Sequence, residues 1–185
     1  MLLSKLAIVD STLREGEQFF KSNFSTADKF EIAGELDKFG VEYIEVTSPT
    51  VSPQSYQDCQ NLAQLGLQAK IVTHIRCHIE DAKIALDTGV DGINLFMGTS
   101  KLLRQFGHGK SLDEVINIAT EVITFIHQQN PQVELRFSTE DSFRSSLSDL
   151  LRVYLFLNKL GIVNRFGVAD TCLLYTSDAA DESLC

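Results

Sequence analysis

Residues 39–46 read Phe39-Gly40-Val41-Glu42-Tyr43-Ile44-Glu45-Val46, and this stretch joins an apolar-periodic segment to a short run of β-type residues. The same junction returns at Thr88-Gly89-Val90-Asp91 and at Leu160-Gly161-Ile162-Val163-Asn164. A glycine that follows a helix can adopt the left-handed conformation and so satisfy the last helical carbonyls. The apolar residues that come next favour a strand. The repeated junction therefore predicts a helix followed closely by a strand, three times along the chain.

Helices and strands are predicted to alternate over most of the sequence. Apolar residues recur at helical spacing between the strand-like runs, and Ser25 with Asp28 and Ser111 with Glu114 can form capping boxes. We expect helices over residues 26–39, after Ser111, and over residues 146–160. We expect strands over residues 6–10, 43–46, 69–74, 92–97, 134–138 and 165–169.

This alternation favours a parallel sheet with right-handed crossover connections. Periodicity alone does not distinguish an open doubly wound sheet from a closed barrel. A complete (β/α)8 barrel takes about 250 residues, and this chain has 185. As a barrel, this α/β chain would form a partial (β/α)8 TIM barrel with roughly the first six β/α units, and an open doubly wound sheet stays the alternative.

Composition indicates an ordinary soluble protein, with 44% hydrophobic and 22% charged residues. The formal net charge of −9, with no basic run, argues against binding to nucleic acid. No apolar stretch is long enough to cross a bilayer, and the N-terminus does not resemble a signal peptide. The four cysteines have no paired spacing, so we expect reduced thiols and a cytoplasmic location.

Polar residues collect directly after the predicted strands, where the chemistry of parallel α/β folds is located. Carboxylates with a histidine suit a hard divalent cation, and arginines suit anionic substrates. An isolated charged residue at a strand end is usually a cap or a surface ion pair, but the combined set indicates a site. The set comprises Asp10, Arg14, Glu15, Gln18, Glu45, His74, Arg76, Arg136, Ser138, Glu140, Asp170 and Thr171.

Two further patterns are weak. His74, Cys77 and His78 resemble part of a zinc site, but the last two begin the next helix and point away from the strand end. Gly109-Lys110-Ser111 resembles the end of a phosphate-binding loop, yet Arg104 stands where that motif requires its first glycine. His108 lies between two glycines and is expected to make a loop contact, with substrate contact as the alternative.

The nine residues from Asp10 to Gln18, Asp-Ser-Thr-Leu-Arg-Glu-Gly-Glu-Gln, resemble the first-strand signature of a metal-dependent acyl-CoA enzyme family. This family contains homocitrate, isopropylmalate and citramalate synthases, with hydroxymethylglutaryl-CoA lyase as a relative. The resemblance extends to Thr171, and it implies that residues 1–171 are the N-terminal part of a TIM-barrel catalytic domain. Four further segments look most like homocitrate synthases: residues 43–49, 73–78, 98–100 and 136–144.

The resemblance implies a Claisen-type condensation of acetyl-CoA with 2-oxoglutarate to give homocitrate and CoA. It implies a divalent metal (Mg, Mn or Zn), acetyl-CoA as co-substrate and a homodimeric parent protein. Glu15 matches the family's metal ligand, and Arg14 matches the arginine that steadies the keto group and the developing oxyanion. The other matching positions are Gln18, Glu45 and Glu140 for catalysis, with Glu140 a candidate for proton transfer, and His74, Arg136, Ser138 and Thr171 for the oxo acid.

The sequence departs from the family at two places. Fungal homocitrate synthases carry aspartate where this chain has Asn94, a position associated with feedback binding of lysine. After Thr171 the family continues with a glycine-rich turn and a later His-x-His pair that completes the metal site. Residues 172–185 instead resemble the translation of a sequencing-library adapter, so we expect them to be artefactual and the 185-residue chain to be inactive.

Three alternatives to this function stay open. One is a different oxo-acid specificity, as in isopropylmalate synthase, and another is a C–C lyase that runs the reverse type of reaction. The third is a non-catalytic remnant that binds a 2-oxo acid. The sequence does not decide between a role in lysine biosynthesis and one in supplying a nitrogenase cofactor.

Overall fold

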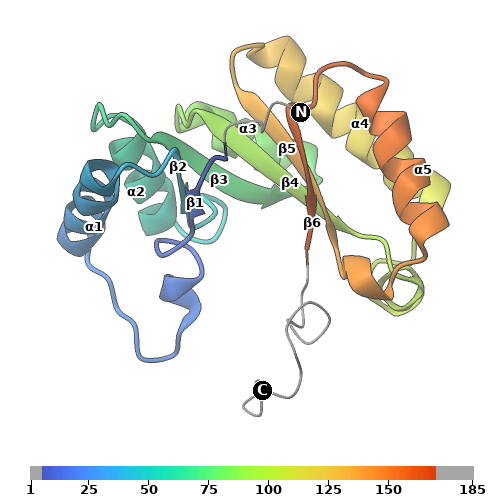
Figure 1. Cartoon of the computed structure of the whole chain (residues 1–185), viewed down its shortest axis with the longest axis horizontal. Helices are drawn as coiled ribbons and strands as arrows, with labels where there is room; N and C mark the ends of the chain where they lie inside the picture. The colour runs from blue at the N-terminus through green and yellow to red at the C-terminus, as the bar shows by residue number, and fades with distance from the viewer. Residues whose placement is uncertain (1–5, 170–185) are drawn as a thin grey trace.

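The computed structural model describes residues 6–169, in which six parallel strands form a curved sheet with helices on its outer face (Figure 1). The sheet has the order β1-β2-β3-β4-β5-β6, and every neighbouring pair is parallel. The strands are β1 (Val9–Asp10), β2 (Tyr43–Val46), β3 (Lys70–Arg76), β4 (Gly92–Gly98), β5 (Glu134–Glu140) and β6 (Arg165–Val168).

The sequential strand order decides between the two architectures that periodicity left open. A doubly wound sheet reverses its strand order at a switch point, whereas a barrel adds each strand beside the previous one. The observed order never reverses, and β1 and β6 are the two edges of the sheet. The predicted partial (β/α)8 barrel is confirmed, with six strands within the described residues.

Five longer helices cover the convex face of the sheet (Figure 1). Ser25 and Ser111 form the predicted capping boxes with Asp28 and Glu114, which confirms both helix starts. The helices are α1 (Thr26–Phe39), α2 (Pro53–Ala63), α3 (Ile79–Asp87), α4 (Leu112–Gln129) and α5 (Leu147–Asn158). Short helical turns occur at η1 (Gly16–Gln18), η2 (Leu103–Gly107) and η3 (Ser142–Arg144).

The repeated glycine junctions have the predicted geometry. Gly40, Gly89 and Gly161 have φ angles of 92°, 75° and 69°, in the left-handed region that a side chain disfavours. Asp91, two positions after Gly89, forms hydrogen bonds to the neighbouring strand β3 both as a donor and as an acceptor. The Asp91 amide donates to the Ile71 carbonyl at 2.8 Å, and the Asp91 carboxylate accepts from the Ile71 amide at 2.8 Å. Each junction thus ends a helix and also fixes the start of a strand.

The two faces of the sheet differ in chemistry because strand side chains alternate between them. The face under the helices is apolar and buried, and it includes Ile44, Ile71, Ile93, Leu95, Leu135 and Phe137, each at most 2% exposed. The concave face carries the alternate residues, which are mostly polar. They include Tyr43, Glu45, His74, Asn94, Glu134, Arg136, Ser138 and Arg165.

Several element boundaries differ from the sequence-based prediction. Strand β1 is limited to Val9 and Asp10, because only these residues pair with β2. Strand β3 continues to Arg76, since it stays in register with β4 up to Phe96.

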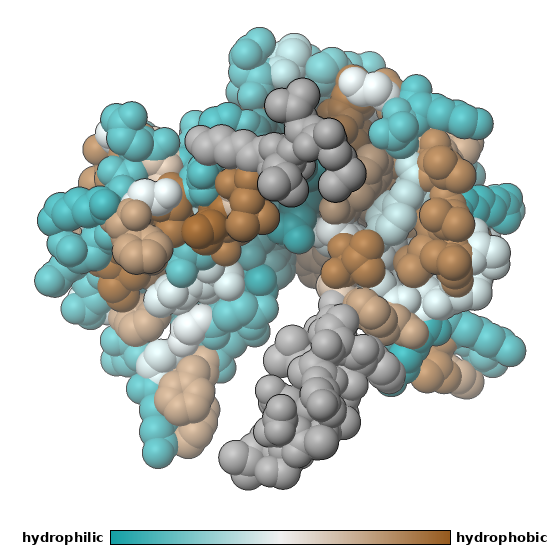
Figure 2. Space-filling model, viewed as in Figure 1, coloured by the Kyte–Doolittle hydropathy of each residue, from teal (hydrophilic) through white to brown (hydrophobic). Residues whose placement is uncertain are grey.

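Helix α5 has exposed apolar residues on its outer side, visible as a brown column in Figure 2, namely Leu147, Leu151, Leu155 and Phe156.

Candidate functional site

The loop after β1 places two charged candidates at the carboxyl end of the sheet. Leu13 is 1% exposed and anchors the loop in the core, and its carbonyl accepts hydrogen bonds from the amide and hydroxyl of Thr47, both at 3.1 Å. Arg14 and Glu15 follow directly and form an ion pair with each other. The anchored leucine therefore fixes where the arginine and the glutamate leave the core.

A hydrogen-bonded row of side chains crosses the concave face from β1 to β5. Arg14 Nε lies 2.6 Å from Glu45 Oε2, and the other oxygen of Glu45 accepts from the Asn94 amide at 3.1 Å. The Asn94 carbonyl oxygen in turn accepts from the Ser138 hydroxyl at 3.0 Å. Glu45 is only 3% exposed, so its charge depends on these donors rather than on water. Three residues predicted from separate strands, Arg14, Glu45 and Ser138, are thus joined in one network through Asn94, which was not among the predicted site residues.

His74 lies on the same face and is in register with Asn94. Burial, reinforced by the positive charge of Arg14, lowers the pKa of His74 below its ordinary value, although Glu45 and Glu15 act in the opposite direction. The imidazole is therefore neutral at pH 7. Its ring meets Phe96 edge-on, with the ring centroids 4.9 Å apart. A neutral imidazole held in this way can donate or accept a hydrogen bond without adding charge.

Arg136 reaches across β6 at a glycine. A Cβ atom built on Gly167 would lie 2.3 Å from Ser138 Oγ and 2.8 Å from Arg136 Nη2. A larger residue at this position would displace both polar side chains. The absence of a side chain at Gly167 thus leaves the space that the guanidinium group occupies.

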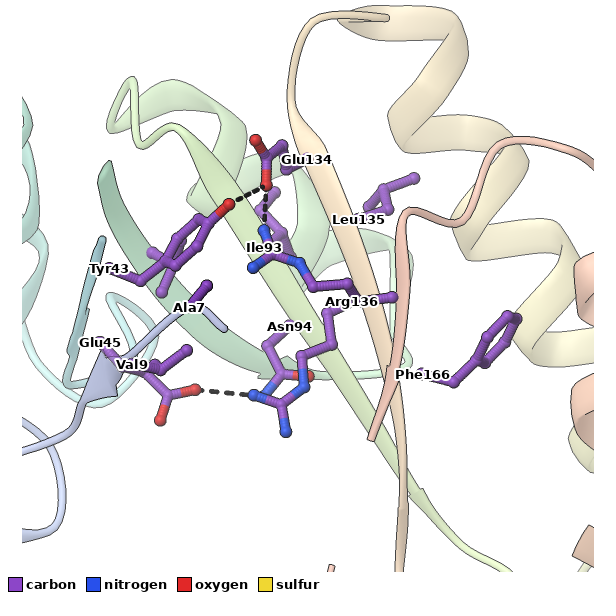
Figure 3. A pocket seen from close by; sticks show the side chains of 12 residues that line it. Ala7, Val9, Tyr43, Glu45, Ile93, Asn94, Glu134, Leu135, Arg136 and Phe166 are labelled. Atoms are coloured by element: carbon purple, nitrogen blue, oxygen red, sulfur yellow. Dashed lines mark hydrogen bonds and ion pairs between the residues drawn. The ribbon is translucent and has the colours of Figure 1, made fainter. Parts of the chain in front are cut away.

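A cavity of about 320 Å³ lies on the concave face, and its lining includes neither Arg14, His74 nor Ser138 (Figure 3). Glu45, Asn94 and Arg136 line one part of it, and Tyr43 and Glu134 line the part near the amino ends of the strands. Both Arg136 and Glu45 belong to the set predicted from the sequence. A cavity with cationic and anionic walls suits a small polar ligand better than an apolar one.

The sequence analysis did not predict a charged cluster around Glu134. This carboxylate accepts from the Tyr43 hydroxyl at 3.1 Å and forms ion pairs with Lys70 and Arg165. Arg165 also stacks on Tyr43, with the guanidinium carbon 3.9 Å from the ring centroid. Burial alone would raise the pKa of Glu134, but Lys70 and Arg165 hold it below its ordinary value. The only sequence signal for this cluster is the alternation that places these residues on the concave face.

Other predicted residues lie at the rim or outside the site. Gln18 is exposed in η1, and Glu140 ends β5 opposite Gly98. Arg76 makes a two-point ion pair with Asp81 of α3, at 2.8 and 2.9 Å, and does not join the row. His108 holds its own loop, because its Nε2 lies 3.0 Å from the Gly98 carbonyl oxygen. Thr171, Asp170 and the boundary at residues 172–185 lie outside the described residues.

The donor set for a metal ion is incomplete in the described part of the chain. Within residues 6–169 no three His, Cys, Asp or Glu side chains come together in a way that could hold a metal. Glu15, the predicted ligand, has a side chain that is 57% exposed and pairs with Arg14. Residues 6–169 therefore do not by themselves fit a metal centre.

Comparison with known proteins decides the family. The family model described as HMGL-like matches residues 5–184. The chain belongs to the HMGL-like family. As an HMGL-like protein it is 54% identical over 169 residues to the cytosolic isozyme of homocitrate synthase from Saccharomyces cerevisiae, which covers 91% of this chain. It is 56% identical over 164 residues to the mitochondrial homocitrate synthase of the same yeast, which covers 89% of this chain.

The HMGL-like chain spans 39% and 37% of the lengths of these two relatives. Its fold matches the solved structure of hydroxymethylglutaryl-CoA lyase from Pseudomonas aeruginosa, with a TM-score of 0.73. That match covers 96% of this chain and 61% of the lyase at 21% identity, so it supports the fold alone. None of the helices in residues 6–169 is long and apolar enough to span a membrane.

Proposed function

We propose that this chain forms the first six β/α units of an acyltransferase that condenses acetyl-CoA with 2-oxoglutarate to give homocitrate and CoA. The observation that carries the proposal is the row from Arg14 through Glu45 and Asn94 to Ser138, which joins the loop after β1 to strands β2, β4 and β5 on the concave face. The 54% and 56% identities to two homocitrate synthases support the choice of oxo acid. The corresponding location is cytoplasmic, and the parent protein is a homodimer.

The proposed substrate has a ketone and two carboxylates, and the site offers groups for each. Arg136 can pair with one carboxylate at the cavity, with Ser138 beside it as a hydroxyl partner. Arg14 is positioned by Glu45 and can donate to the keto oxygen. His74, neutral at pH 7, can hold the remaining polar atoms of the oxo acid.

The reaction itself makes one carbon–carbon bond and breaks one thioester. A base, for which Glu140 is the candidate, removes a proton from the methyl group of acetyl-CoA. The resulting carbanion attacks the keto carbon of 2-oxoglutarate, and the keto oxygen gains negative charge that Arg14 stabilises before it takes up a proton. Water then cleaves the thioester, which leaves a carboxylate and releases CoA as the thiol. Gln18 lies at the rim, where it can contact the reacting groups.

A divalent cation would polarise the ketone as a Lewis acid when bound. We propose Glu15 as one of its ligands, since this carboxylate is exposed beside Arg14. The further ligands would come from outside residues 6–169, and we therefore expect the 185-residue chain alone to be inactive. Magnesium, manganese and zinc are all compatible with carboxylate and imidazole ligands.

The test is an assay of the intact protein, with its coding DNA first sequenced through the codon for Thr171. Release of CoA from acetyl-CoA is measured with 2-oxoglutarate and, in parallel, with 2-oxoisovalerate. Faster release with 2-oxoglutarate supports the proposal, whereas faster release with 2-oxoisovalerate supports the isopropylmalate synthase alternative. Saturable binding of an oxo acid with no CoA release would favour the non-catalytic alternative.

A further inference from the structure

A buried lysine lies behind the loop that carries Arg14 and Glu15, outside the concave site. Lys29 is in the first turn of α1, and its side chain is 9% exposed. Its ammonium group lies 2.6 Å from Glu17 of the β1 loop and 2.7 Å from Asp58 of α2. One cation therefore joins the loop and two helices.

The groups around Lys29 are almost fully hydrogen-bonded. Asp58 is 3% exposed, and its second oxygen accepts from the Thr26 hydroxyl and the Gln54 amide, both at 2.8 Å. Glu17 also accepts a hydrogen bond from the Thr47 hydroxyl. Burial alone would lower the pKa of Lys29, but the hydrogen bonds to Asp58 and Glu17 raise it above its ordinary value. The lysine is thus a fixed cation between two anions, and such buried pairs are costly to disrupt.

The position of this ion pair along the loop is informative. Leu13 is anchored in the core and Glu17 is anchored by Lys29, so Arg14 and Glu15 lie between two fixed points. Thr47 connects the anchors, because its hydroxyl contacts both the Leu13 carbonyl and Glu17. Without the second anchor, the loop would keep Leu13, the Arg14–Glu45 pair and its own backbone hydrogen bonds, but it would lose the fixed point on the far side of Glu15.

We propose that Lys29 is a positioning residue that holds the β1 loop through Glu17, so that Arg14 meets both Glu45 and Glu15. Lys29 itself contacts Glu17 and Asp58 rather than the concave cavity. The consequence for catalysis rests on the proposed function, but the mechanical role does not. Tethering of a loop by one buried cation is expected to reduce local opening of that loop.

Hydrogen exchange of the whole chain tests the tether without any need for activity. The amides of Arg14, Glu15 and Gln18 are protected by bonds within the loop, at 2.9, 2.8 and 3.0 Å. Loss of a charged hydrogen bond should accelerate their exchange about 10-fold in Glu17→Gln and up to about 100-fold in Lys29→Met. Glu17→Gln keeps the pairing of the lysine with α2, so it tests the tether even if Lys29→Met unfolds.

Two matched variants separate the tether from general destabilisation. Lys29→Arg retains the cation and should restore most of the protection. Lys38→Met removes a lysine from the same helix whose side chain is 74% exposed, and it should leave loop exchange unchanged. Equal acceleration in β4 and α4, or unchanged loop exchange in both Glu17→Gln and Lys29→Met, would overturn the proposal.

In the intact enzyme, Glu17→Gln should lower kcat about 10-fold with a smaller change in KM. If the unmodified enzyme shows no condensation, the function has failed, and the exchange result still decides the tether.

Discussion

Replacement of Asn94 by aspartate would put a second carboxylate into the row that crosses the concave face. The Asn94 amide nitrogen lies 3.1 Å from Glu45 Oε1, so Asn94→Asp replaces a donor with an anion at about that distance. Coulomb's law gives about 5 kcal/mol of repulsion between two unit charges 3.1 Å apart at an effective dielectric constant of about 20. Arg14, 2.6 Å from the other oxygen of Glu45, offsets part of this repulsion.

Repulsion between the two carboxylates should make the folded variant retain one proton above the ordinary aspartate pKa near 3.9. The folded variant then binds more protons than the unfolded chain above that pH, so its stability decreases as the pH rises. If Arg14 offsets about half of the repulsion, the variant loses about 2 to 3 kcal/mol of unfolding free energy at pH 7.5, relative to pH 4.

Urea unfolding followed by far-ultraviolet circular dichroism measures this directly, because the chain has no tryptophan for fluorescence. The unfolding free energy of Asn94→Asp is subtracted from that of the unsubstituted 185-residue chain at several pH values between 4 and 8. Asn130→Asp makes the same charge change at an exposed position and serves as the control. A difference that is constant over this pH range would refute the hydrogen bond between Asn94 and Glu45.

Three further predictions concern single side chains. Asp91→Ala removes the carboxylate that accepts from the Ile71 amide, and it should lower the urea-unfolding free energy by about 1 kcal/mol. Gly167→Ala places a methyl group where Ser138 Oγ lies 2.3 Å away; calorimetric titration of the intact protein should show 2-oxoglutarate affinity reduced about 10-fold or more. His74 has a lowered pKa, chiefly through burial, so the unfolded chain binds more protons near pH 6 and stability should increase as the pH rises towards 6.5. In His74→Gln this part of the pH dependence, measured by urea unfolding from pH 5 to 7.5, should disappear.

The local features of the fold were predictable because their causes are local in sequence. A capping box depends on Ser25 and a residue three positions later, and a left-handed helix end depends on a single residue such as Gly40. The strands were predictable for the same reason, because the alternation of apolar and polar residues along a strand is also local in sequence. The choice of a barrel over a doubly wound sheet required the strand order, which depends on how distant segments pack.

The site was only partly predictable for the same reason. Its members could be chosen from their positions at strand ends, but their pairing follows from strand register. Asn94 bridges Glu45 and Ser138 over separations of 49 and 44 residues. The Tyr43–Glu134 contact spans 91 residues, and no local pattern marks it. Lys29 reads in the sequence as one more charged helix residue, and only the packing of α1 on α2 buries it.

Residues 6–169 are proposed to contribute the oxo-acid-binding part of the site of a 2-oxoglutarate-specific acyltransferase. The most direct measurement uses a chimera in which these residues replace the aligned segment of the Saccharomyces cerevisiae cytosolic homocitrate synthase, with which the chain is 54% identical. Release of CoA from acetyl-CoA is measured with 2-oxoglutarate and with 2-oxoisovalerate, after circular dichroism has established that the chimera is folded. We expect release that depends on 2-oxoglutarate and that decreases at least about 100-fold on Arg14→Gln. A folded chimera that prefers 2-oxoisovalerate, or whose activity is unchanged by Arg14→Gln, would contradict the proposed function.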